Sequence, residues 1–464
     1  MTSEVYNVKP KQAEALNDLS KIIGKKIPCL DERGIPSFGV KIDDDNVISL
    51  WLERCGLKEL PKQILKLDTI KELYLGYNSL TKLPESFNKL NSLEKLNLRW
   101  NILIILPKTF GDLDLLEVVE LDTNKLTTLP ESFSNLRALQ ELILRNNQFK
   151  SLPESFSNLD SLKELYLSKN KFTQFPKSVC NLKSLEGLYL DYNNLSTLPD
   201  NICHLKNLRI LSLAGNSLKS LPEKILKPLF SLNSLRVLDF SHNQLKSLPE
   251  AIQNLTKLKV LRLRDNNLKD LPVSFGKLES LQSLDISKNN FKELPEPILE
   301  LSNLERLYAE DNALENIPKL FGNLKSLKQL FLENNQIKTL PNSFGNLKLL
   351  QQIFLVNNQL TSLPNSIGNL KSLRILDLRN NQLTSLPNSI GKLKSLEELD
   401  LRHNEFITIP NIIRKLENLR QFFLKLEGNP FNIRSARMVS KDLNSIREFL
   451  KRKENLRDSI DKSK

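Results

Sequence analysis

Cysteine, histidine, methionine and tryptophan are scarce in this chain of 464 residues, which contains 4 Cys, 3 His, 2 Met and 2 Trp. The cysteines are too few and too scattered to form a disulfide framework in so long a chain, so we expect reduced thiols. They are Cys29, Cys55, Cys180 and Cys203. An extracellular location is therefore disfavoured.

Long apolar runs are also lacking. Residues 1 to 11 contain no apolar run of about 7 to 15 residues, the length that a secretory signal needs. No run of about 18 apolar residues, the length of a membrane-spanning helix, occurs in the sequence. We expect a soluble, cytoplasmic protein that does not enter a membrane.

A repeat of 23 residues is the dominant feature of the chain. Residues 162–184 read LKELYLSKNKFTQFPKSVCNLKS and residues 373–395 read LRILDLRNNQLTSLPNSIGKLKS, and both fit LxxLxLxxNxLxxLPxxIxxLxx. Counting forward from Val47 gives seventeen such units. The unit at residues 208–234 has four extra residues, which we expect to form a loop. The last unit, near residue 421, is displaced by two residues from the period.

Each position of the unit has a physical role. The alternation in LxxLxL predicts a short strand with leucines pointing inward and the intervening residues pointing outward. The following Asn is expected to turn the chain and to satisfy backbone groups of neighbouring units; only the first unit departs, with Cys55 at that place. Sixteen of the 22 Pro occupy one position, where Pro starts the convex return.

These repeats resemble the leucine-rich-repeat family over residues 47–431, and specifically the 23-residue class of intracellular Ras-related repeat proteins and their bacterial relatives. The resemblance implies an α/β leucine-rich-repeat solenoid, a curved arc with parallel strands on its concave face and irregular or short helical turns on its convex face. It also implies a scaffold that binds protein partners, in some members small GTPases or phosphatases, without catalysis or a cofactor.

Both ends of the chain are expected to cap the solenoid, because a bare end would expose its core. In residues 1–46, an amphipathic helix over Pro10 to Ile23 is followed by a hairpin that turns at residues 43–46. In residues 432–464, Ser440 precedes a helical pattern, and the charged tail from Lys451 is expected to fray.

Aromatic residues are segregated on the outward positions of the strands. Such residues form interface hot spots, and we predict that they bind the partner. The alternative is that they only stack along the sheet. The predicted partner-binding residues are Trp51, Tyr74, Tyr77, Trp100, Tyr166, Tyr189, Tyr192, Tyr308, Phe331 and Phe354.

These residues include one cluster near the amino end and another past the middle of the chain. With strands about 4.8 Å apart, the two clusters are expected to lie on the order of 50 Å apart. Either one extended partner or two partners would then use the face.

The predicted concave face has a net negative charge, whereas the whole chain has a net positive charge. The outward positions of the first sixteen units hold sixteen acids and eleven bases, although the formal net charge is +13. A nucleic-acid binder would place Lys and Arg on its binding face, so we expect no nucleic acid. A protein partner with a basic patch fits better.

Catalytic and metal sites are not expected. His242 and His403 stand seven units apart, so no cluster can include both. Cys29 and Asp31 have the Cys-x-Asp spacing of bacterial ubiquitin ligases, but the helical domain that houses it there has no counterpart. Cys180 and Cys203 share a repeat position; they either form a disulfide or fill a site for small residues.

Two functions from different classes remain. We expect a monomeric cytoplasmic scaffold in signal transduction, of the kind that works with small GTPases. The alternative is a secreted or injected effector that binds a host protein.

Overall fold

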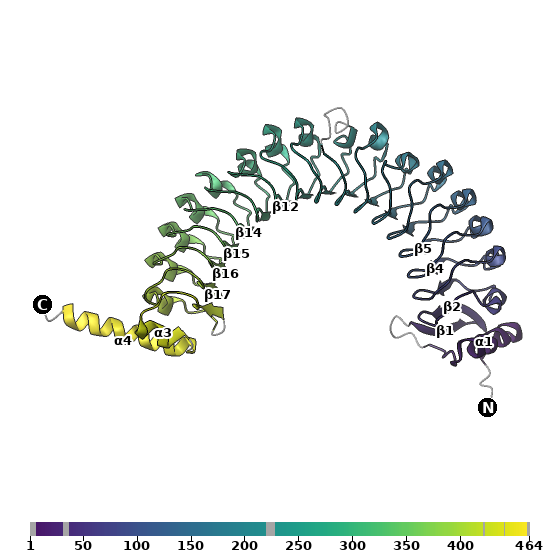
Figure 1. The fold of residues 1–464 in the computed structure, drawn as a ribbon, viewed down its shortest axis with the longest axis horizontal. Helices are drawn as coiled ribbons and strands as arrows, with labels where there is room; N and C mark the ends of the chain where they lie inside the picture. Colours follow the sequence, from purple (N-terminus) through teal and green to yellow (C-terminus); the bar gives the residue numbers. More distant parts are fainter. Residues whose placement is uncertain (1–5, 31–36, 220–227, 421–422, 440, 462–464) are drawn as a thin grey trace. The chain divides into compact units, whose positions relative to one another are not determined.

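The computed structural model describes residues 6–30, 37–219, 228–420, 423–439 and 441–461. The chain forms two compact units, Met1–Leu238 and Asp239–Lys464. Each unit is a stack of repeats in which the short strands line the concave side and the helical turns line the convex side (Figure 1).

The first unit begins with helix α1 (Pro10–Ile23), the range in which the sequence predicts a helix. The buried Gln12 side chain joins α1 to the first repeat: its Nε2 donates to Thr69 Oγ1 at 2.8 Å, and its Oε1 accepts from the Val47 amide at 2.8 Å. The antiparallel hairpin β1 (Phe38–Asp43) and β2 (Asn46–Leu52) follows. Its turn residues Asp44 and Asp45 have φ of 44° and 54°, as a two-residue type I′ turn requires.

Seventeen repeat strands, β2 to β18, follow in the described residues, as the repeat count predicts. Within each unit they pair in parallel and one period apart, so that Leu73 of one repeat stands beside Leu96 of the next. Their leucines are almost completely buried. The strands after β2 are β3 (Glu72–Tyr74), β4 (Lys95–Asn97), β5 (Val118–Glu120), β6 (Glu141–Ile143), β7 (Glu164–Tyr166), β8 (Gly187–Tyr189), β9 (Ile210–Ser212), β10 (Val237–Asp239), β11 (Val260–Arg262), β12 (Ser283–Asp285), β13 (Arg306–Tyr308), β14 (Gln329–Phe331), β15 (Gln352–Phe354), β16 (Ile375–Asp377), β17 (Glu398–Asp400) and β18 (Leu424–Lys425).

The convex return of most repeats is one turn of 3₁₀ helix that starts directly after the proline that recurs at one position of the repeat. Proline suits this place because it fixes φ and its missing N–H is not needed there. These turns confirm the predicted solenoid with short helical turns. They are η1 (Lys62–Lys66), η2 (Glu85–Lys89), η3 (Lys108–Asp112), η4 (Glu131–Asn135), η5 (Glu154–Asn158), η6 (Lys177–Asn181), η7 (Asp200–His204), η8 (Glu250–Asn254), η9 (Val273–Lys277), η10 (Glu296–Glu300), η11 (Phe321–Asn323), η12 (Asn342–Asn346), η13 (Asn365–Asn369), η14 (Asn388–Lys392) and η15 (Asn411–Lys415).

A ladder of buried asparagines joins neighbouring turns. Asn101 is typical: its Nδ2 donates to the Leu75 and Leu98 carbonyls at 3.0 and 3.1 Å, and its Oδ1 accepts from the Leu80 amide at 2.9 Å. Because these backbone groups are shielded from water, the amide side chain satisfies donors and acceptors that would otherwise be orphaned. The first repeat lacks this Asn, and there the Cys55 amide donates to Asn78 Oδ1 at 3.0 Å.

The residue directly before each ladder Asn adopts left-handed backbone geometry. Tyr77, Trp100 and Tyr192 have φ of 55°, 53° and 52°. These three aromatics therefore stand on the turn after a strand, whereas the sequence pattern placed them with the outward residues of the strand itself. Left-handed φ is uncommon for bulky residues, so the repeat imposes this geometry on whichever residue occupies the position.

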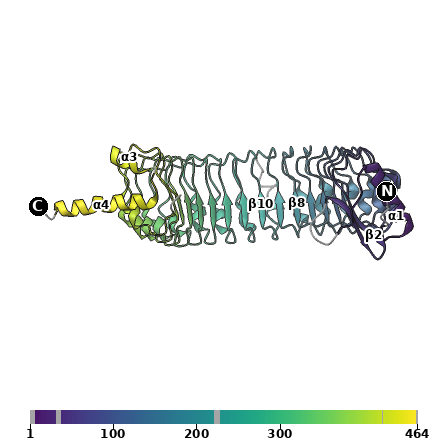
Figure 2. The ribbon, with the colours of Figure 1, turned by 90° about the horizontal axis from the view of Figure 1, so that it is seen from below.

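The second unit ends in β18 and two helices, α3 (Ile433–Val439) and α4 (Leu443–Asp461). Asn429 continues the ladder with the predicted displacement, since its Nδ2 donates to the Leu401 carbonyl at 2.8 Å. Helix α4 packs against η15 and then extends away from the repeats of its unit (Figure 2).

Helix α4 begins at Leu443 and extends further than the sequence predicts. Ser440 lies outside the described residues, and Asp442 caps the helix by accepting from the Ser445 amide at 2.9 Å. The structure continues α4 to Asp461, where the sequence predicted a frayed tail from Lys451. Residues 220–227 of the predicted insertion also lie outside the described residues.

Candidate binding faces of the two repeat units

Trp51 and Tyr74 form the first aromatic stack of the first unit. Their rings are nearly parallel with centroids 5.3 Å apart, and they stand side by side in β2 and β3. Only 8% of Trp51 is exposed, whereas Tyr74 is half-buried. Trp51 is thus a packing residue, and it offers a partner less surface than its outward strand position suggests.

Tyr77 and Trp100 form a second stack, on the turns that follow the strands, with centroids 5.5 Å apart. Trp100 keeps 50% of its surface exposed. The guanidinium groups of Arg54 and Arg99 lie 4.6 and 5.3 Å from the Tyr77 ring centroid. The two cation–π contacts and the stack with the indole hold Tyr77 in place, so Trp100 stacks on a ring that is itself supported.

Acidic residues surround these rings. Arg99 pairs with Glu53 at 3.2 Å and lies 3.9 Å from Glu120. Burial, with Glu72 as a further cause, raises the pKa of Tyr74 to about 12, and burial raises the pKa of Glu120 above its ordinary value. The acids outnumber the cation that holds them together, so this part of the concave face favours a cationic partner group.

Tyr166, Tyr189 and Tyr192 make the third group of the first unit. Tyr166 and Tyr189 stack with centroids 4.4 Å apart, and the Arg145 guanidinium lies 4.4 Å from the Tyr166 centroid. Burial and the charge of Glu164 raise the pKa of both stacked tyrosines. Tyr192 is 52% exposed and has Lys169 Nζ at 5.9 Å from its ring.

In the second unit, Tyr308, Phe331 and Phe354 stack in one continuous row. Successive centroids are 4.6 and 4.9 Å apart and the rings are within 7° of parallel. The three residues occupy the same place in β13, β14 and β15, which pair in parallel. Each is half-buried, so the row presents a narrow apolar strip on the concave face of its unit.

Carboxylates flank this row. Burial raises the pKa of Glu333 to about 7, and the neighbouring charges of Glu310, Asp377 and Asp311 add to the effect. Within the described residues, Glu333 Oε2 has no hydrogen-bond partner. A cation placed beside the row would supply the missing partner and return the pKa of Glu333 toward its ordinary range.

Further along the second unit the charges are matched. Arg379 pairs with Asp377 at 2.8 Å and lies 3.4 Å from Asp400, and Arg402 pairs with Asp400 at 2.6 Å. Asp400 is 1% exposed. Because these ions satisfy one another, the unmatched acidity of this unit is concentrated near Phe331.

The structure thus places the ten predicted aromatics in four groups, and their role in binding stays a prediction. The stacking alternative is also visible in the structure, since each of the four groups contains stacked rings.

Family models for leucine-rich repeats match almost the entire repeat region. One, described as a leucine-rich repeat region, matches residues 224–336 and 328–456, and another, described as a leucine rich repeat, matches residues 45–103, 104–149, 150–195 and 160–218. The chain belongs to the leucine-rich repeat family. Comparison with curated protein sequences yields no match.

Solved leucine-rich repeat structures are similar to this chain over most of its length. A leucine-rich repeat protein of Leptospira interrogans is 36% identical, with a TM-score of 0.74, and the alignment covers 85% of this chain and 94% of that one. Toll of Drosophila, in its complex with Spatzle, is 27% identical with a TM-score of 0.69, covering 81% of this chain and 52% of that one. The ectodomain of the Arabidopsis thaliana receptor kinase GASSHO1, in complex with CASPARIAN STRIP INTEGRITY FACTOR 2, is 28% identical with a TM-score of 0.55, covering 85% of this chain and 57% of that one.

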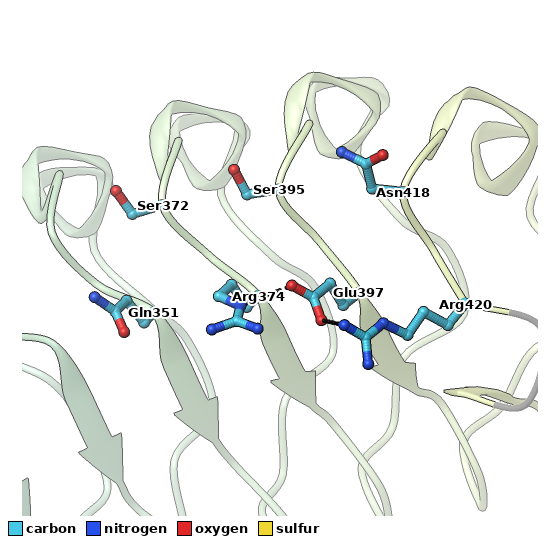
Figure 3. A pocket seen from close by; sticks show the side chains of 7 residues that line it. All are labelled: Gln351, Ser372, Arg374, Ser395, Glu397, Asn418 and Arg420. Atoms are coloured by element: carbon cyan, nitrogen blue, oxygen red, sulfur yellow. Dashed lines mark hydrogen bonds and ion pairs between the residues drawn. The ribbon is translucent and has the colours of Figure 1, made fainter.

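A polar hollow of about 600 Å³ lies beside the strands of the second leucine-rich repeat unit (Figure 3). Glu397 stands between Arg374 and Arg420 and accepts from them at 2.7 and 2.5 Å. The hydrogen bond from Arg374 is the main cause that lowers the pKa of Glu397, and Arg420 adds to the effect. Because Glu397 holds both arginines, the hollow presents no clear anion site.

The cysteines of this leucine-rich repeat protein are free in the described structure. Cys180 is buried in η6, and burial raises the pKa of its thiol to about 12. In other repeats the same position is a close-packed Gly: a Cβ on Gly322 would lie 2.2 Å from the Ser343 carbonyl oxygen. The free, buried thiol favours the small-residue interpretation over the disulfide.

The other candidate residues are His242 and the pair Cys29 and Asp31. His242 is exposed and bonds to Asp265 at 2.7 Å. The described ranges contain no group of three His, Cys, Asp or Glu side chains that would hold a metal ion. Cys29 is exposed, and Asp31 lies outside the described residues.

None of the helices in the described part of the chain has the length and apolar character needed to cross a bilayer.

One exposed apolar surface of the first unit was not predicted from the sequence. Ile102, Ile104 and Ile105 are exposed on the segment after β4. An alignment of the repeats with one another would have revealed it, because Ile104 and Ile105 occupy the positions that Thr127 and Thr128 hold in the next repeat.

Proposed function

We propose that this leucine-rich repeat protein is a non-catalytic scaffold whose concave faces bind a protein partner that carries a basic patch. The observation that carries the proposal is the exposure of Trp100 and Tyr192. They remain 50% and 52% exposed although each stands beside a supporting cation or ring. Large aromatics held in one orientation lose little entropy on binding and commonly dominate interface energies.

The charge of the partner follows from the acids around the aromatics. Glu53 and Glu120 share Arg99, and Glu333 stands unpaired beside Phe331. Lys or Arg side chains of a partner would pair with these acids and lie against the rings.

The similar structures support the same proposal. The Toll structure is a complex with Spatzle, and the GASSHO1 structure is a complex with CASPARIAN STRIP INTEGRITY FACTOR 2. For this chain we propose a monomer that acts in the cytoplasm in signal transduction of the small-GTPase type, without nucleic acid, membrane or cofactor. The scarcity and scatter of its cysteines support that compartment.

The test is capture of proteins from a lysate of the organism that makes this chain. Wild type is compared with Trp100→Ala and Tyr192→Ala, both at exposed positions where the fold should tolerate alanine, and each variant is checked by circular dichroism. Leu349→Ala serves as the control, because Leu349 is 48% exposed but lies between η12 and β15, on the side of the repeat that precedes the strand.

We expect wild type and Leu349→Ala to retain the same partner, and at least one aromatic variant to retain about tenfold less. The lost partner should bear a cluster of Lys and Arg, and raised salt should weaken its capture. Equal capture by all four proteins would refute binding at the concave face of the first unit.

A further inference from the structure

Three exposed isoleucines interrupt an otherwise polar edge of the first unit. Ile102, Ile104 and Ile105 are 37%, 57% and 57% exposed. They lie in the segment between β4 and η3, and the two leucines of this segment, Leu103 and Leu106, are buried in the core. The isoleucines are therefore the apolar residues that this segment presents to solvent.

No other repeat carries this arrangement. In the next repeat the three positions are Lys125, Thr127 and Thr128. Among the first sixteen repeats, the only other isoleucine in these columns is Ile407, which stands alone. The core needs no apolar residue at these places, so the three isoleucines are not explained by folding.

Unpaired lysines flank the isoleucines. The Lys125 amide donates to the Leu103 carbonyl at 2.9 Å, which places Lys125 beside the edge. On the other side, the Ile104 amide lies 3.4 Å from the Thr81 carbonyl, and Lys82 follows Thr81. Both lysines are exposed, and neither has an ion pair with any described residue.

Lys82 also belongs to a hollow of about 780 Å³ formed by the first two repeats and α1. Leu60, Leu65 and Leu83 supply its apolar lining, and its charged residues are five lysines and two glutamates. Lys62 and Lys89 are exposed there and, like Lys82, lack an ion pair within the described chain. Lys11 and Lys66 pair with Asp68 and Glu14, so three unpaired lysines and two glutamates line the hollow. A hollow with both apolar and basic residues thus adjoins the apolar edge.

We propose that the edge formed by Ile102, Ile104 and Ile105, together with the adjoining hollow, docks an acidic segment of a partner protein whose apolar side chains alternate with Asp or Glu. The apolar side chains cover the isoleucines and enter the hollow, and the carboxylates pair with Lys82 and Lys125. This charge preference is opposite to that of the concave faces. A second copy of this chain placed by twofold symmetry would bring the same lysines together, which disfavours it as the occupant.

The proposal is tested with a bead-displayed library of short random peptides, panned against the full-length protein. Peptides that bind wild type are sequenced, and their affinities are measured by fluorescence anisotropy for each variant. The edge variant is Ile104→Thr with Ile105→Thr, which reproduces the residues of the next repeat and so preserves the fold. Ile407→Thr is the matched control, because Ile407 holds the same repeat position as Ile104 and is 64% exposed.

We expect wild type to enrich peptides that combine Asp or Glu with apolar residues. Their affinity should fall about tenfold in the edge variant and in Lys82→Glu, and stay unchanged in Ile407→Thr. Tyr192→Ala should also leave the peptide affinities unchanged. Failure of this proposal can therefore be distinguished from failure of the concave-face proposal, which is tested by capture from a lysate.

Three outcomes would overturn the proposal. One is that the panning enriches no peptides, or only peptides that lack Asp and Glu. Another is equal affinity of the enriched peptides for wild type and the edge variant. The third is dimerisation of wild type in sedimentation velocity that the edge variant abolishes, since the occupant would then be a second copy.

Discussion

The ring of Trp51 lies against the ring of Tyr74, with centroids 5.3 Å apart and planes within 9° of parallel, and only 8% of Trp51 is exposed. Trp100 makes the same kind of stack with Tyr77 yet is 50% exposed. The two tryptophans of the chain therefore have different roles, although their outward positions are similar in sequence.

Trp51→Ala and Trp100→Ala should separate these roles. Removing the buried Trp51 should lower the free energy of unfolding by about 3 to 5 kcal/mol, because a cavity replaces a large apolar side chain. Trp100→Ala should cost about 1 kcal/mol, mainly the lost stacking. Urea denaturation followed by circular dichroism measures both changes, and equal losses would show that exposure does not distinguish the two residues.

Asn266→Ala should destabilise the second unit strongly. Asn266 Nδ2 donates to the Phe240 and Leu263 carbonyls at 2.9 and 3.0 Å, and its Oδ1 accepts from the Leu245 amide at 2.9 Å. Alanine leaves these shielded backbone groups without partners, so we expect a loss of about 2 to 4 kcal/mol. The adjacent, exposed Asn267→Ala is the control and should change the urea midpoint little; a comparable shift in both would contradict the ladder's role.

The repeat and its strands were predictable because both depend on local pattern. The 23-residue period places the inward leucines and the ladder Asn, and Asn101 makes the cross-turn bonds that its position predicts. The helix at Pro10–Ile23 follows from amphipathic spacing and a Gly at its end.

The accessibility of individual residues was not predictable from that pattern. Trp51 is buried beside its neighbour in β3, and Trp100 stands on a left-handed turn that the strand alternation does not describe. The environment of Glu333 depends on acids from other repeats, among them Glu310 and Asp377. These properties arise from packing between turns, which no single repeat contains.

Cys180 should resist alkylation while the protein is folded. Burial raises the pKa of its thiol to about 12, so almost no thiolate forms near neutral pH, and the side chain is only 1% exposed. Iodoacetamide should label the exposed Cys29 and leave Cys180 unmodified until urea unfolds its repeat, as peptide mass spectrometry would measure. Labelling at equal rates, or a Cys180–Cys203 disulfide in non-reduced digests, would contradict this packing.

Glu333→Gln should stabilise the second unit at alkaline pH. Burial raises the pKa of Glu333 from 4.5 to about 7, so between these values the folded protein holds a proton that the unfolded chain has released. The free energy of unfolding therefore falls as the pH rises from 4.5 to about 7. Above the folded pKa, the full cost of burying the charged carboxylate is present.

Glutamine has no proton to lose and removes this cost. Since Glu333 is partly solvated, screening reduces the effect, and we expect a gain of about 1 kcal/mol at about pH 8 that shrinks toward about pH 5. Urea midpoints across this range measure it, with the exposed Glu293→Gln as the control that should show no pH-dependent difference. A gain that is independent of pH would mean that the glutamine acts by shape or hydrogen bonding, and the unpaired carboxylate beside Phe331 would lose its value as a site for a partner's cation.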